Sequence, residues 1–219
     1  MNKLFIDTAN IEEIKDVISK GIISGVTTNP SLLAKEPKAD FYDHIKKIAE
    51  VCDGLPLSVE VFATEPQAMI DQAHEIIRTL DYPNANIKIP IGYEELRVVS
   101  ELSKNNIRVN CTCCFTSTQL ELAAIAGARY VSLFYNRLLD VNGDPSMVLA
   151  DTRKFIDENN LNCEIISGSI RKATDVSSAW ASGCHVVTAG HKVILEMTKH
   201  SQTDKSINGF LEDFKEWIS

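Results

Sequence analysis

Short runs rich in valine, isoleucine, threonine and cysteine recur along the whole chain, and each has the length of a buried strand. The segments between them show helical periodicity, with apolar residues three or four positions apart. The predicted strands are 4–9, 24–29, 57–62, 86–90, 108–114, 130–136, 163–169 and 184–190. The predicted helices are 11–20, 41–52, 67–80, 93–104, 117–126, 145–159, 173–182 and 191–199. This regular alternation predicts an α/β fold with a parallel sheet.

The number of strand–helix units selects the architecture. Eight units, with no linker or low-complexity segment between them, predict a single (β/α)8 barrel domain over residues 1–219. The alternative, a doubly wound open sheet, would need a glycine-rich phosphate turn after the first strand, where the chain has IDTANIEE. Thr64 and Asp144, each shortly ahead of a proline, are predicted to cap two of the helices.

A further amphipathic helix is predicted after the eighth unit, over residues 206–219. One of its faces carries a stripe of large apolar side chains: Ile207, Phe210, Leu211, Phe214, Trp217 and Ile218. This stripe predicts packing against another apolar surface, on the chain's own barrel or on a neighbouring subunit.

Composition narrows the classes of partner and compartment. The 219 residues carry a net charge of -8, which argues against a nucleic-acid-binding protein, whose binding face is basic. No apolar run approaches the roughly 20 residues that span a bilayer. The six cysteines lie mostly in apolar, strand-like runs without the histidine partners of a zinc site. With no signal peptide predicted, we expect reduced core thiols and a cytoplasmic protein.

Polar side chains interrupt the predicted strands in a regular way. Alternate residues of a barrel strand point into the interior, and the others point toward the helices. The polar residues that this parity places inward are Asp7, Thr27, Asn29, Ser58, Glu60, Asn86, Lys88, Asn110, Thr112, Ser167, Ser169 and Arg171. Most lie toward the carboxyl ends of their strands, where barrel enzymes hold their catalytic groups.

Lys88 is the most informative of these residues, because a strand interior is a costly place for an ammonium group. Burial favours the uncharged amine, which is the form that attacks a carbonyl carbon and makes a Schiff base. Glu60 and Asp7 could supply the proton transfers that such chemistry requires. Arg137, Ser169 and Arg171 follow the sixth and seventh strands, close to the phosphate-binding corner common in barrels.

Several motifs in order, FIDTAN, GVTTNPSLL, VEV, IKIP, NCT, YNR and SGSIR, resemble those of the small transaldolases, the group that includes fructose-6-phosphate aldolases. The resemblance covers essentially the whole chain, and GVTTNPS followed by KIP is its most specific part. It implies a (β/α)8 barrel without metal or organic cofactor that acts on sugar phosphates. It also implies a homo-oligomer, a pentamer or a decamer, with the C-terminal helix reaching a neighbour.

The resemblance also assigns roles, position by position. Lys88 matches the Schiff-base lysine, and Asp7 matches the acid/base that acts on the C4 hydroxyl. Glu60 and Thr112 match the pair that holds the catalytic water. The substrate-binding residues that it implies are Thr28, Asn29, Asn110, Phe134, Arg137, Ser169 and Arg171. The chain departs from the pattern in its cysteine-rich NCTCCF, where Cys113 and Cys114 are candidate oxidation-sensitive thiols.

Within this group, transfer and aldol cleavage are the two activities to separate. The aldolases typically have Gln at the position of Glu60 and Tyr at the position of Phe134. These residues, together with Asn110, resemble the transferases, which protect their three-carbon intermediate from water. The expected function is transaldolase action in the non-oxidative pentose phosphate pathway, and the alternative is an aldolase that releases dihydroxyacetone.

Two hypotheses from other classes remain. A metal-dependent barrel aldolase would need a histidine cluster at the strand ends, and its activity would be lost on chelation. A non-catalytic sugar-phosphate-binding protein would keep the arginines and bind ligand without turnover.

Overall fold

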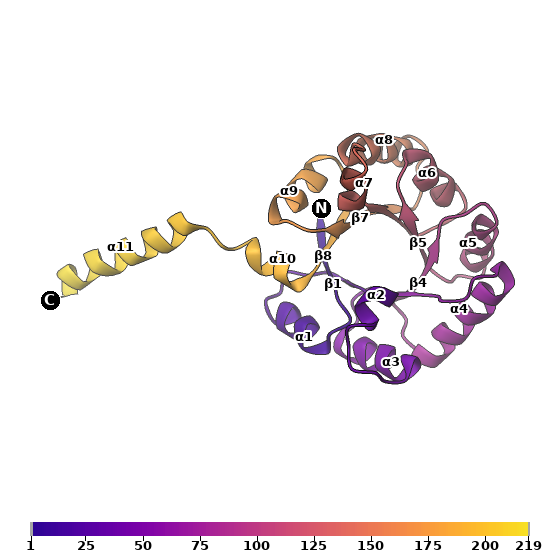
Figure 1. Cartoon of the computed structure of the whole chain (residues 1–219), viewed down its shortest axis with the longest axis horizontal. Helices are drawn as coiled ribbons and strands as arrows, with labels where there is room; N and C mark the ends of the chain where they lie inside the picture. The colour runs from indigo at the N-terminus through magenta and orange to yellow at the C-terminus, as the bar shows by residue number, and fades with distance from the viewer. Residues whose placement is uncertain (1, 219) are drawn as a thin grey trace.

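Eight parallel strands close into a barrel in the computed structural model of the chain, which describes residues 2–218 (Figure 1). The strands pair in chain order, and β1 pairs with β8 to complete the ring. Their bounds are β1 (Lys3–Asp7), β2 (Val26–Thr27), β3 (Leu57–Glu60), β4 (Ala85–Pro90), β5 (Val109–Cys114), β6 (Tyr130–Phe134), β7 (Glu164–Ile170) and β8 (Val186–Ala189). The predicted (β/α)8 barrel is confirmed.

Helices surround the ring of strands, as Figure 1 shows. Those that correspond to the eight predicted helices are α1 (Ile11–Ser19), α3 (Phe41–Val51), α4 (Pro66–Leu80), α5 (Glu95–Lys104), α6 (Ser117–Ile125), α8 (Pro145–Glu158), α9 (Ala173–Ala181) and α10 (His191–Glu196). Two short helices, α2 (Pro30–Leu33) and α7 (Tyr135–Asp140), follow β2 and β6 and were not predicted. Four and six residues are too few to show an amphipathic period.

Local details differ from the prediction at a few positions. Strand β2 has two residues where six were predicted, because the chain turns into α2 directly after Asn29. Asp144 caps α8, where its carboxylate accepts from the backbone N–H groups of Ser146 and Met147. The Thr64 cap is wrong, since Glu65 occupies the cap position of α4 and makes no side-chain cap bond.

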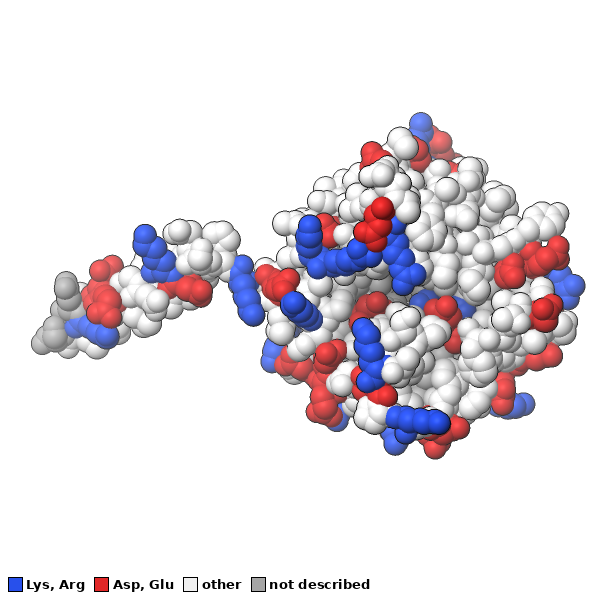
Figure 2. All heavy atoms as spheres, viewed as in Figure 1, with Lys and Arg blue, Asp and Glu red and all other residues white. Residues whose placement is uncertain are grey.

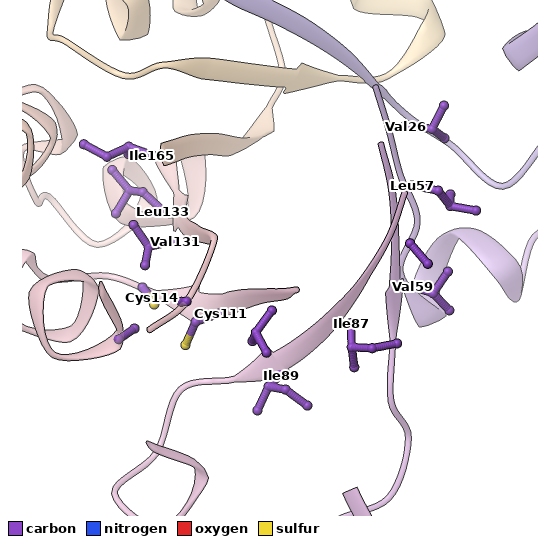
Figure 3. Close-up of a cluster of buried hydrophobic side chains, with 14 of the residues drawn as sticks. Val26, Leu57, Val59, Ile87, Ile89, Cys111, Cys114, Val131, Leu133 and Ile165 are labelled. Atoms are coloured by element: carbon purple, nitrogen blue, oxygen red, sulfur yellow. The ribbon is translucent and has the colours of Figure 1, made fainter. Parts of the chain in front are cut away.

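The apolar core lies between the strands and the helices. Alternate strand residues such as Val59, Ile87, Ile89 and Leu133 are fully buried there and point away from the barrel axis (Figure 3). Cys111 lies in the same layer. Burial of aliphatic side chains in this layer supplies the main favourable term for folding.

A second, smaller apolar cluster fills the barrel interior toward the amino ends of the strands. It consists of Phe5, Tyr130, Ile166 and Val186, with the Phe5 and Tyr130 rings edge to face at 6.1 Å. A Cβ atom on Gly25 would lie 2.5 Å from the Phe5 ring, so the ring requires glycine there. This cluster fills the barrel interior at the amino ends of the strands, so the polar groups lie at the carboxyl ends.

The C-terminal helix α11 (Ser201–Ile218) begins five residues earlier than predicted and extends away from the barrel (Figure 1). Its apolar stripe is open to solvent, with Phe210 71% and Trp217 81% exposed. Met1, the first residue of the predicted domain, and Ser219, the last residue of the predicted helix, lie outside the described residues. None of the helices between residues 2 and 218 is long and apolar enough to cross a membrane.

Candidate active site

A cavity of about 170 Å³ opens at the carboxyl ends of the strands, where Figure 2 shows a hollow in the centre of the barrel. Its walls are formed by Asp7, Thr27, Asn29, Ser31, Glu60, Lys88, Asn110, Thr112, Cys113, Ser132, Phe134, Arg137, Gly168, Ser169 and Thr188. Nine of the eleven residues predicted for the site are among them; Thr28 and Arg171 are not.

Lys88 lines this cavity and is 6% exposed. Its strand β4 pairs with β3, so that Lys88 lies directly beside Glu60. The Nζ atom is 2.9 Å from Glu60 Oε2 and donates a hydrogen bond of 2.9 Å to the backbone carbonyl of Thr28. The Glu60 carboxylate and the Thr28 carbonyl replace the hydrogen bonds to water that the Lys88 amine loses on burial. Glu60 is also close enough to accept a proton from the amine.

Asp7 faces the same cavity from the end of β1. Burial raises the pKa of its carboxyl, and the nearby charge of Lys88 and a hydrogen bond from Thr27 oppose this shift only in part. The Thr27 hydroxyl is 2.7 Å from Asp7 Oδ1, and it is 2.6 Å from the hydroxyl of Thr188. A raised pKa suits a carboxylate that has to accept a proton near neutral pH.

The two asparagines are held by their neighbours. Ser132 donates a hydrogen bond of 2.6 Å to Asn110 Oδ1, and Asn110 Nδ2 donates to the Ser58 hydroxyl at 3.2 Å. Asn29 Oδ1 accepts from the backbone of Leu32 and thereby caps α2. The short helix that was not predicted therefore fixes a residue of the cavity wall.

Thr112 has a buried hydroxyl with no hydrogen-bond partner among the described side chains and backbone groups. Such a group normally binds a water or a ligand atom, because leaving it unpaired costs about 1–3 kcal/mol. Thr112 and Glu60 both line the cavity around Lys88. This arrangement is suited to holding a water between them.

Only two of the three predicted phosphate-binding residues line the cavity. Arg137 and Ser169 line the cavity, and the Arg137 guanidinium lies 4.5 Å from the centre of the Phe134 ring. Arg171 lies outside the cavity lining, half exposed, in an ion pair with Asp140. A shift of register in β7 between Ser167 and Ile170 explains the difference, because it breaks the alternation on which the prediction relied.

Thr28 also lies outside the lining. Its hydroxyl donates to the Ser58 carbonyl at 2.9 Å, so the residue contributes to the site through its backbone carbonyl, which binds Lys88.

Four polar residues of the cavity wall, Ser31, Cys113, Ser132 and Thr188, were not predicted to line the site, although Cys113 was named as a candidate oxidation-sensitive thiol. Ser132 could have been found, because it shares the parity of Phe134 in β6. Cys113 could not, because β5 bulges between Cys111 and Cys114, and Cys113 adopts a left-handed backbone with φ of 62°. The other five cysteines are buried. Contact with Cys111, together with burial, raises the pKa of Cys114 well above its usual range.

No group of three or more histidine, cysteine, aspartate or glutamate side chains within residues 2–218 is arranged to hold a metal ion. The chemistry that the cavity offers is that of a buried amine paired with the Glu60 carboxylate, with the Asp7 carboxyl, amides, hydroxyls and an arginine on the same walls.

The sequence profile of the family described as Transaldolase/Fructose-6-phosphate aldolase matches residues 4–218. The chain belongs to this family. Membership in the transaldolase/fructose-6-phosphate aldolase family agrees with the closed eight-stranded barrel.

Relatives in this family match along nearly their whole length. A probable transaldolase of Thermoanaerobacter sp. (strain X514) is 42% identical over 213 residues, or 97% of each chain. The probable transaldolase of Desulforudis audaxviator (strain MP104C) is 42% identical over 212 residues, again 97% of each chain. That of Clostridium acetobutylicum is 42% identical over 214 residues, or 98% of each.

Proposed function

We propose that this chain is a transaldolase that transfers a dihydroxyacetone unit between sugar phosphates through a Schiff base on Lys88. The donor is sedoheptulose 7-phosphate or fructose 6-phosphate, and the acceptor is glyceraldehyde 3-phosphate or erythrose 4-phosphate. The observation that carries the proposal is the buried Lys88 amine, which lies 2.9 Å from the Glu60 carboxylate in a cavity that Asp7 also lines. Similarity to relatives named probable transaldolases supports it.

The first half of the reaction forms the imine. Lys88 passes a proton to Glu60 and attacks C2 of the ketose with its free amine. Glu60, through a water held with the Thr112 hydroxyl, returns protons while the carbinolamine loses water. The protonated imine then acts as an electron sink, so the proposed reaction uses no metal or organic cofactor.

The second half breaks the C3–C4 bond. Asp7 accepts the proton of the C4 hydroxyl as the bond breaks, and an aldose phosphate leaves. The raised pKa of the Asp7 carboxyl favours this transfer. The dihydroxyacetone enamine stays on Lys88, held by the amides of Asn29 and Asn110, until an acceptor aldose phosphate enters and the steps reverse.

In this proposal Arg137 and Ser169 bind the phosphate from the cavity wall, and Arg171 binds it from outside the lining. Phosphate far from the reacting carbons positions both substrates by charge and by hydrogen bonding.

Aldol cleavage with release of free dihydroxyacetone is the alternative activity. It requires water to hydrolyse the intermediate. The Phe134 ring lines the cavity and packs edge to face on Phe115 at 5.8 Å, so that side offers the intermediate no hydroxyl group. This apolar contact favours transfer.

Borohydride trapping tests the Schiff base. Incubation with fructose 6-phosphate and borohydride, followed by peptide mass spectrometry, should place the reduced adduct on Lys88. Lys88→Met should lose both the adduct and turnover, while Lys35→Met, a control at an exposed lysine outside the cavity lining, should keep both. An adduct on another lysine, or turnover by Lys88→Met, would refute the proposal.

The proposal includes a homo-oligomer, a pentameric ring or a decamer, of chains that each form one domain over 1–219. The helix over residues 206–219 then packs on a neighbouring subunit. Exposure of Ile207, Phe210, Leu211, Phe214 and Trp217 along α11 supports this, because a contiguous apolar surface of that kind is unfavourable in water. The reaction belongs to the non-oxidative pentose phosphate pathway of the cytoplasm.

Light scattering after gel filtration tests the assembly. The parent chain should run as an oligomer, and Phe214→Ser should dissociate it. Asp213→Ser, one position along the same helix, should leave it intact. A monomeric parent chain, or equal behaviour of the two variants, would contradict the subunit contact.

A further inference from the structure

The two arginines of the predicted phosphate corner are in different situations. Arg137 borders the cavity, whereas the guanidinium of Arg171 is already bound by a carboxylate. Arg171 Nη1 donates to Asp140 Oδ1 at 2.8 Å, and Nη2 donates to Asp140 Oδ2 at 2.6 Å. This two-bond fork is the geometry in which a guanidinium also binds phosphate, so carboxylate and phosphate use the same donors.

Asp140 is not explained by its own helix. It is the last residue of α7, where a negative charge is unfavourable because the helix carbonyls already make that end negative. The hydrogen bond from Arg171 lowers the pKa of the Asp140 carboxyl, and the charge of Arg137 acts in the same direction. Asp140 is therefore ionised at neutral pH and brings a negative charge to the two arginines of the corner, and Asp175 adds a second negative charge near Arg171.

The guanidinium of Arg171, one residue beyond the end of β7, can change partners without movement of its backbone. Its backbone N–H donates to Asn136 Oδ1 at 3.1 Å, and Asn136 Nδ2 in turn donates to Asp175 at 2.9 Å. The Arg171 and Asp140 side chains are 52% and 53% exposed. The backbone is fixed while the end of the side chain lies in solvent, and Figure 2 shows basic side chains gathered on the α7 and α9 side of the hollow.

We propose that Asp140 is a specificity-determining residue that competes with the phosphate of the substrate for Arg171. This inference rests on the proposed function, since it concerns the phosphate corner of the same cavity. Asp140 weakens the binding of every phosphorylated ligand, both the one that must leave and the one that must enter. When an aldose phosphate departs, the carboxylate takes back the guanidinium and opposes rebinding.

We expect this competition to have a modest effect on phosphate affinity. Exposed ion pairs contribute little to stability, so Asp140→Asn should strengthen phosphate binding by about two- to fivefold. Added salt should reduce the difference, because it screens charges at an exposed corner. Unphosphorylated ligands should not respond to the substitution.

Titration with inorganic phosphate, followed by calorimetry or by ³¹P line broadening, measures this without turnover. Asp140→Asn should lower the Kd relative to the parent chain, and Asp140→Glu, which keeps the charge, should stay close to the parent. Asp157→Asn is the matched control, because it removes one carboxylate from an exposed arginine pair on α8. In an Arg171→Ala background, the gain from Asp140→Asn should fall below about twofold.

An unchanged or raised phosphate Kd in Asp140→Asn would overturn the inference, and so would an equal gain in Asp157→Asn. With turnover, Asp140→Asn should lower KM for fructose 6-phosphate at constant kcat and leave KM for unphosphorylated fructose unchanged. The two proposals fail separately. A chain that binds phosphate as expected but never transfers dihydroxyacetone refutes the function alone, and an active enzyme with an unresponsive Asp140 refutes the competition alone.

Discussion

The Thr27 hydroxyl lies 2.7 Å from Asp7 Oδ1 and donates its single proton to that carboxylate. Because the proton is used, the Thr188 hydroxyl must be the donor in its 2.6 Å contact with Thr27. The three side chains come from β2, β1 and β8 and form a hydrogen-bonded chain with one direction. Such a chain strengthens the bond to the ionised form of Asp7 and fixes its orientation.

Removal of the Thr188 hydroxyl should therefore change the properties of Asp7. Thr188→Val keeps the shape but leaves Thr27 without its donor, which should cost about 1–3 kcal/mol of stability. The weaker bond to the carboxylate should raise the pKa of Asp7 further and shift the acid limb of the activity profile upward. A pH profile of kcat/KM with the natural donor measures this. Thr188→Ser keeps the hydroxyl and should retain the parent profile, whereas identical profiles for Val and Ser would contradict the chain.

Asp7 itself should cost the folded state stability at neutral pH. Its folded pKa is raised by burial, so the folded protein holds this proton more tightly than the unfolded chain does. The free energy of unfolding therefore falls as the pH rises from about 4 through the raised folded pKa. Its slope approaches about 1.4 kcal/mol per pH unit. Asp7→Asn should be inactive but more stable than the parent at pH 7, with the difference vanishing near pH 4. Denaturant unfolding across this range tests it, and a destabilised variant with no pH dependence would show that burial is not the dominant cause.

Glu60 and Phe134 should together control the fate of the intermediate. The double variant Glu60→Gln, Phe134→Tyr adds a hydroxyl beside the cavity and changes how water is held there. We expect the ratio of dihydroxyacetone release to transfer onto erythrose 4-phosphate to rise by about tenfold, equivalent to 1.4 kcal/mol. Phe115→Tyr alters the ring that packs behind Phe134 and is the control. An unchanged ratio in the double variant would count against exclusion of water by Phe134.

Cys113 should be the thiol through which alkylation inactivates the enzyme. Burial raises the pKa of its thiol, and Glu60 adds to this, while Lys88 and Arg137 oppose it. Because the thiolate is the nucleophile, inactivation by iodoacetamide should be slow at pH 7 and accelerate by about tenfold per pH unit toward pH 9. Fructose 6-phosphate should protect the enzyme, and Cys113→Ser should be resistant. Rapid inactivation of Cys113→Ser would point to another thiol, such as the buried Cys114.

The sequence was informative wherever the period of two residues held. Strands β3 and β4 are regular, so parity correctly predicted that Glu60 and Lys88 lie side by side. Apolar periodicity and the count of eight units, together with the lack of a glycine-rich turn after the first strand, predicted the closed barrel, which is confirmed.

The features that could not be predicted break local regularity. Cys113 and Ser169 have left-handed backbones, with φ of 62° and 59°, in the register shifts of β5 and β7. A shift of this kind changes which of the following residues face the cavity, and no pattern of side chains predicts it. The Arg171–Asp140 pair joins residues 31 positions apart, and neither residue identifies the other in the sequence.

The apolar cluster of Phe5, Tyr130, Ile166 and Val186 has a consequence for kinetics. It blocks the amino end of the barrel. At the same end, Glu164, the first residue of β7, forms ion pairs with Lys3 at 2.8 Å and with Arg129 at 2.9 Å. Every molecule that reaches Lys88 must then pass the same opening, in one direction and afterwards in the other. In the proposed transfer reaction, the first product has to vacate that passage before a second reactant enters, so we expect a double-displacement order with parallel lines in reciprocal plots.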